Sequence, residues 1–157
     1  MNQCVILNLG QGYWQRGFPD VTAQLWEANR TTPIQFLGCL PAHPALVRQY
    51  QQWRTLYKLL YGQPNTSRQE RDEFSIEVIE DDITHVSEAD FRSLGQDLQR
   101  HFNQWLDSPG FRPIDQKLRT SLSPKDEIRV MISAKEHDVL RFPWLIWHLF
   151  DDYPKAE

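Results

Sequence analysis

Two cysteines and five histidines are the residues of this 157-residue sequence that could take part in nucleophilic catalysis. A cysteine thiolate is activated when a histidine lies within hydrogen-bonding distance as its base, and the two partners can be far apart in the sequence. Cys4 and Cys39 lie inside predicted strands, whereas a catalytic cysteine is usually displayed at a strand end or on a loop. We therefore retain a cysteine hydrolase, with Cys39 as its nucleophile, only as a second alternative. Otherwise both thiols are expected to be small buried groups in a reducing compartment.

One cluster of carboxylates and an imidazole has the donor types of a metal site: Glu80, Asp81, Asp82 and His85. A calcium-binding EF-hand loop needs ligands at alternate positions, a central glycine and a terminal glutamate, and this stretch has none of that pattern. The histidines lack a His-Glu-x-x-His spacing, and neither cysteine belongs to a Cys-x-x-Cys pair. We expect an acidic strand exit before a capped helix, with no metal and no cofactor.

The glycine-rich stretch GQGYWQRG follows the first predicted strand, where a backbone could cradle a phosphate. A dinucleotide fingerprint needs a third glycine three positions after Gly12, but Gln15 is there, and the next element has the pattern of a strand. The stretch therefore predicts a hairpin loop. Its aromatic residues, including Trp14 and Phe18, either fold back onto the core or form a contact patch.

The composition is that of one soluble domain that binds neither nucleic acid nor an anionic membrane. Its net charge is −4 and its isoelectric point is near 5.7, so it lacks a basic surface. Its apolar runs are shorter than the roughly 20 residues of a membrane span, and the first ten residues do not resemble a signal peptide. We expect a cytoplasmic protein. Six tryptophans are an excess that indicates either core packing or recognition.

The periodicity predicts an α+β fold (mixed α/β) with about five strands in one mixed sheet, packed by three to four helices. The first forty residues alternate as an antiparallel meander of three strands, beginning with Cys4–Leu9, which is apolar on both faces and so suits a central strand. Further strands are predicted at Phe74–Val78 and Ile128–Ile132. A helix is predicted after Pro44.

A second, long helix is expected from a capping box at Ser87 and Asp90 to Ser108, and a shorter one runs from Pro113 to about Leu122. The last predicted helix, Arg141–Phe150, is apolar almost all round, and such a helix is normally covered on several sides. We expect it to need a neighbour beyond this domain. The candidate interaction residues are aromatic side chains of this helix and of the glycine-rich loop. They are Trp14, Phe18, Trp144, Trp147 and Phe150.

Several segments resemble the N-terminal region of cyanobacterial multidomain proteins that carry a CHAT domain, a caspase-like module. They are VILNLGQG near the start, IQFLGCLP, WLDSPGFRPIDQKLR, and the stretch from Glu127 to Glu157. The phrase RFPWL is similar to the LPWEL element near the start of CHAT domains, with Phe142 in place of leucine and Leu145 in place of an acidic or polar residue. The catalytic histidine and cysteine motifs of that family have no counterpart in these residues. The resemblance thus implies a non-catalytic N-terminal domain, spanning 1–157, before a caspase-like domain.

The sequence favours a non-enzymatic accessory, regulatory or protein-interaction domain whose partner is a caspase-like CHAT domain, in cis or in trans. A homodimer stays open, and direct membrane contact is not expected. The first alternative is a small-molecule or peptide sensor with an aromatic pocket around Trp14, Trp26 and Trp53.

Overall fold

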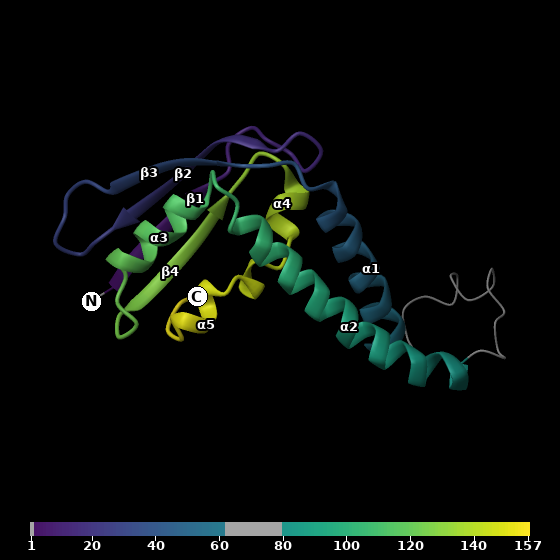
Figure 1. Ribbon diagram of the computed structural model, residues 1–157. Helices are drawn as coiled ribbons and strands as arrows, with labels where there is room; N and C mark the ends of the chain where they lie inside the picture. Colours follow the sequence, from purple (N-terminus) through teal and green to yellow (C-terminus); the bar gives the residue numbers. More distant parts are fainter. Residues whose placement is uncertain (1, 62–79) are drawn as a thin grey trace. The chain divides into compact units, whose positions relative to one another are not determined.

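Figure 1 shows the computed structural model of the chain, which describes residues 2–61 and 80–157 and the side chains of all of these except 80–87. The described residues form two units. The first comprises Met1–Val47 and Gln99–Glu157, and the second is Arg48–Leu98. Each unit is described by itself below, and the expectation of a single domain stays a prediction.

The first unit is built on a mixed sheet of four strands in the order β3-β2-β1-β4. The strands are β1 (Asn2–Asn8), β2 (Phe18–Trp26), β3 (Ile34–Leu40) and β4 (Glu127–Ser133). The first three pair antiparallel, and β4 pairs parallel with β1, so the meander, the central position of the first strand and the α+β class are confirmed. The strand predicted at Phe74–Val78 lies outside the described residues.

The loop between β1 and β2 is the predicted hairpin loop. Gly10 and Gly17 have φ values of 67° and 85°, which side chains other than glycine rarely adopt. The backbone N–H of Tyr13 donates to the oxygen of Gly17 at 3.2 Å, and a register shift follows between Phe18 and Val21. The glycines therefore shape a turn that folds the loop back along the sheet.

Helix α3 (Arg112–Ser121) lies over one face of the sheet (Figure 1). Its apolar residues Ile114 and Leu118 are fully buried. Gly38 lets the helix come close, because a Cβ built there would lie 2.7 Å from Cδ1 of Ile114. The predicted helix from Pro113 is confirmed, with Pro113 in the first turn, where a missing N–H costs nothing.

The prediction of one continuous helix over Arg141–Phe150 is wrong. The structure has α4 (His137–Arg141), a 3-10 turn (Trp144–Ile146) and α5 (Leu149–Asp152). Pro143 is the cause, because proline lacks an N–H and disfavours helical geometry in the residue before it. Phe142 accordingly has extended dihedral angles, φ −61° and ψ 144°.

The second unit contains most of α1 (Pro44–Tyr61) and the first part of α2 (Glu80–Leu106). The ring of Trp53 stacks on Phe91 at 5.4 Å, and it also contacts Gly95, where a Cβ would lie 3.3 Å from its Nε1. The predicted helix from Pro44 is confirmed. The predicted start of α2 at Ser87 is wrong, because the helix already begins at Glu80 and its first turn includes Asp81 and Asp82. Whether a strand leads into this acidic stretch concerns residues outside the described ones.

Candidate functional site

Four of the five candidate interaction residues are buried in the first unit. The exposed fractions are 3% for Trp14, 1% for Phe18, 6% for Trp144 and 2% for Trp147, whereas Phe150 is half-buried. Of the two alternatives for the glycine-rich loop, its aromatic residues therefore take the first and fold back onto the core. The apolar surplus inferred for the C-terminal segment is largely covered by the chain itself.

The buried rings of Trp14, Phe18 and Trp144 belong to one aromatic cluster that joins the loop to the C-terminal segment. Trp14 lies 5.0 Å from Trp105 and 5.3 Å from Phe142. Trp144 makes an edge contact with Phe102 at 5.2 Å, and its indole N–H donates to the main-chain oxygen of Val139 at 2.8 Å. Because both the rings and this indole N–H have intramolecular partners, the cluster has the properties of a core.

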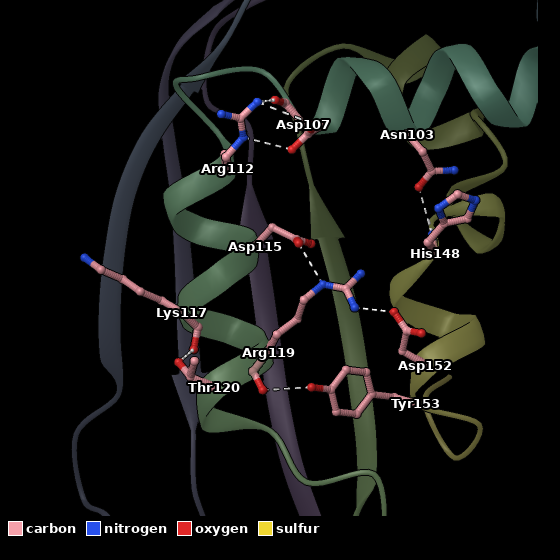
Figure 2. A network of polar contacts seen from close by, with 10 residues as sticks. All are labelled: Asn103, Asp107, Arg112, Asp115, Lys117, Arg119, Thr120, His148, Asp152 and Tyr153. Carbon is pink, nitrogen blue, oxygen red and sulfur yellow. Dashed lines mark hydrogen bonds and ion pairs between the residues drawn. The ribbon is translucent and has the colours of Figure 1, made fainter.

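A polar network fixes the C-terminal segment against α3 (Figure 2). The guanidinium of Arg119 pairs with Asp115 at 2.7 Å and also with Asp152, and the hydroxyl of Tyr153 donates to the main-chain oxygen of Arg119 at 2.9 Å. Burial alone would lower the pKa of Arg119, but its bonds to Asp152 and Asp115 outweigh burial and raise it. These contacts join α3 to α5, which is a structural role.

Asn103 holds the turn before α5 in the same way. Its side-chain oxygen accepts the backbone N–H of His148 at 2.8 Å (Figure 2). Its amide also donates to the oxygen of Ile146 at 2.9 Å. One polar side chain on α2 thus satisfies two backbone groups of a segment that lacks regular helical hydrogen bonds.

The hollows that the two cysteines border have no histidine in their described lining. Cys39 is exposed and borders a hollow of about 510 Å³, whose described lining includes Arg16 and Ser108 but no histidine. His43 lies near His101; burial lowers the pKa of His43, and the charge of His101 lowers it further. The side chains of the acidic candidate, Glu80, Asp81, Asp82 and His85, lie outside the described ones, and among the side chains that are described no three metal-ligating groups come together.

The sheet face opposite α3 carries exposed apolar side chains and is a candidate interaction surface. We call it the open face. The strand register places five apolar or sulfur-containing side chains on it: Cys4, Ile6, Trp26, Leu37 and Met131. The exposed fractions are 38% for Trp26, 72% for Leu37 and 51% for Met131. The open face is therefore uncovered by the described residues.

The register also shows that these side chains form neighbouring pairs. Trp26 is opposite Cys4 in the antiparallel pair, and Ile6 is beside Met131 in the parallel pair. Cross-strand neighbours on one face contact each other, so the four side chains make a continuous strip over β2, β1 and β4. Leu37 on β3 is separated from the strip by Thr22, Gln24 and Gln35.

A shallow hollow of about 770 Å³ lies at one end of the strip. Trp26, Cys4 and Met131 line it together with charged side chains. The charged residues that border it are Glu27, Glu127, Arg129, Lys155 and Glu157. An apolar centre with a charged border, including tryptophan, methionine and arginine, is the composition that protein interfaces favour.

Sequence reasoning missed the open face although its signal was present. The two apolar faces of the first strand predict a central strand, and this is confirmed, but the strand's position in the sheet does not tell which of its faces is left uncovered. Trp26 was considered only for a pocket with Trp14 and Trp53. In the structure Trp14 belongs to the buried cluster and Trp53 to the second unit.

A scan against protein-family models and searches of curated proteins and solved structures found no match to this chain. Among the described helices, none has both the length and the apolar character needed to cross a membrane.

Proposed function

We propose that this chain is a non-enzymatic accessory domain that binds a caspase-like CHAT effector domain, and that the open face is the contact surface. The observation that carries the proposal is the apolar strip of Trp26, Cys4, Ile6 and Met131, in which Trp26 and Met131 are exposed and Cys4 and Ile6 are half-buried. The resemblance of the segments quoted above to the N-terminal region of CHAT proteins supports the choice of partner. Both cysteines are free thiols, in keeping with a role in the reducing cytoplasm.

The open face fits a protein partner better than the C-terminal segment does. Trp144 and Trp147 are already covered, and the largest exposed apolar group of their segment is a single side chain, Leu145, at 71%. Single exposed apolar residues are ordinary on protein surfaces, whereas a contiguous strip across three strands marks an interaction site.

The proposal is tested by titrating a purified CHAT domain from such a multidomain protein into this chain by calorimetry. Met131→Glu places a charge in the strip and should weaken binding at least about tenfold, or 1.4 kcal/mol. Leu145→Glu is the matched control, because it changes a side chain of similar exposure in the C-terminal segment; its dissociation constant should change less than about twofold.

Two results would overturn the proposal. One is the absence of binding by the unmodified chain at about 0.1 mM, a concentration above the dissociation constants of specific interfaces. The other is equal weakening by both variants, which would mean that the open face is not the contact surface. Thermal melts of both variants show whether either change unfolds the protein.

A ligand sensor is the second candidate, favoured by the hollow beside Trp26. A small molecule or peptide bound there at 100 times its dissociation constant stabilises the protein by about 2.7 kcal/mol, which a thermal-shift screen detects. If the ligand quenches tryptophan fluorescence in the unmodified chain but not in Trp26→Phe, the ligand lies in the hollow.

A further inference from the structure

The outer edge of β3 is the border of the sheet on the side away from β4 (Figure 1). Main-chain groups of a strand alternate between its two sides. The N–H of Cys39 donates to the oxygen of Gly110 at 3.1 Å, so the main-chain groups of Cys39 point outward. By the same alternation the main-chain N–H and oxygen of Gln35 and Leu37 point outward, and those of Phe36 point to β2.

This edge has main-chain groups that a further strand could use. Among the main-chain hydrogen bonds of the described residues, none engages the outward groups of Gln35 or Leu37. Both side chains are exposed, that of Leu37 to 72%. Natural edge strands are often protected by charged side chains or by proline, and Ile34–Leu40 contains neither.

The outward groups are arranged symmetrically about Phe36. If two copies of β3 pair antiparallel with a twofold axis at Phe36, Gln35 of each copy lies opposite Leu37 of the other. Each of these pairs exchanges two main-chain hydrogen bonds, which use the outward N–H and oxygen of both residues. The same surface of the two copies is therefore complementary to itself.

The two ends of the edge match in the same register. Gly110 occupies the place opposite Cys39, where a Cβ on Gly110 would lie 2.7 Å from the main-chain oxygen of Cys39, so an added strand must stop opposite Gly38. The residue of a second copy that lies opposite Gly38 is Ile34, which is the first residue of its strand. Pro33 precedes it and has no N–H to leave unpaired.

The charge of the strand also fits a second copy. Because Ile34–Leu40 is uncharged, a charged segment of another protein would find no complementary charge on it, whereas two copies oppose no like charges. From α3 the ammonium of Lys117 lies 5.6 Å from the ring centroid of Phe36. Lys117 is exposed, so its ammonium can turn to water when two strands meet.

We propose that the outer edge of β3 is a homodimer interface, in which two copies pair antiparallel about Phe36 and join their sheets into one continuous sheet. Main-chain hydrogen bonds supply the affinity of such a pairing, and the positions of Gly110 and Ile34 set its register. The proposed effector would bind over β1 and β4 on a face of the sheet. The pairing at β3 lies in the plane of the sheet, so the two can occur together.

Sedimentation equilibrium of the full chain, from about 1 μM to about 1 mM, should show a monomer–dimer equilibrium with a dissociation constant below about 0.1 mM. Leu37→Pro removes an outward N–H, a change that edge strands tolerate, whereas Leu37→Ala shortens the side chain and keeps the N–H. The dissociation constant of Leu37→Pro should exceed that of Leu37→Ala at least about tenfold, because each dimer loses a hydrogen bond at both of its pairs.

Amide hydrogen exchange of the unmodified protein tests the same surface without a substitution. At low concentration Phe36, whose N–H points to β2, should be protected, and Gln35 and Leu37 should exchange faster. At about 1 mM the exchange of Gln35 and Leu37 should slow about fivefold, and that of Phe36 should stay the same.

A protein that remains monomeric at about 1 mM would overturn the proposal. So would a dimer that forms equally well in Leu37→Pro and Leu37→Ala, or one that leaves the exchange of Gln35 and Leu37 unchanged, because another surface would then be the interface. Protection of Leu37 that arises only when a CHAT domain is added would make a foreign strand the occupant and would also overturn it. The dimerisation measurements use no effector domain, so their failure and a failure of the proposed binding function are separate results.

Discussion

Replacing Trp147 by alanine tests whether the aromatic C-terminal segment is part of the core or a contact surface. Its ring is 2% exposed and makes an edge contact with Phe111 at 5.9 Å. Burial of a tryptophan removes roughly 200 Å² from water, which at about 25 cal/mol per Å² is about 5 kcal/mol as an upper bound. Trp147→Ala should therefore lower the free energy of unfolding by about 3–5 kcal/mol.

The control for this change is Leu145→Ala, two residues away and 71% exposed. It should alter the free energy of unfolding by less than about 0.5 kcal/mol. For a chain of this length, the loss at Trp147 corresponds to a melting temperature about 10 °C lower. Urea unfolding followed by far-ultraviolet circular dichroism measures both variants by linear extrapolation.

A cost below about 1 kcal/mol for Trp147→Ala would refute the assignment of this ring to the core. Such a small cost is what an exposed contact residue gives, and it would return the C-terminal segment to its place as the contact surface. Equal costs for the two variants would refute the burial pattern along the segment, since the structure covers one side chain and exposes the other.

Three further predictions follow from single positions. Gly38→Ala should destabilise the protein by about 2 kcal/mol in denaturant titrations, because the new Cβ would lie 2.5 Å from the backbone oxygen of Gly110. Burial lowers the pKa of His43, so at a pH below the ordinary histidine pKa of about 6.5 the unfolded chain binds more protons than the folded protein. The free energy of unfolding should therefore fall as the pH drops below about 6.5, and the fall should be smaller in His43→Gln. The exposed thiol of Cys39 should react with a thiol-specific reagent about tenfold faster than half-buried Cys4, a difference that unfolding removes.

Local periodicity was enough to predict most elements of the first unit. The alternation of Val21, Ala23 and Leu25 gave a strand, and these three side chains are fully buried on the helical side of the sheet. The helix from Pro44 was equally regular and forms as expected. Such patterns succeed because each element buries one face, and the spacing of apolar residues reports that face directly.

In the C-terminal segment, the apolar composition led to a wrong prediction although one residue, Pro143, indicated a break in the helix. Its apolar residues suggested one helix, but Pro143 sets the backbone of Phe142 and divides the segment into short turns. The aromatic cluster could not be read from spacing, because Trp14 and Trp105 meet only through the tertiary fold. The pairing of Ala156 with Ile128 was equally hidden, since a segment as polar as Pro154–Glu157 has no strand pattern.

The parallel pairing of β1 and β4 indicates which part of the open face a partner should cover. Antiparallel sheets commonly leave one face in water, and there the outward residues are polar, as Thr22 and Gln24 are on β2. Parallel strands are normally covered on both faces, and the outward residues of this pair include Ile6 and Met131. A partner that covers the sheet should therefore lie over β1 and β4 and leave the antiparallel edge at β3 solvated, so that Met131→Glu weakens binding more than Leu37→Glu does.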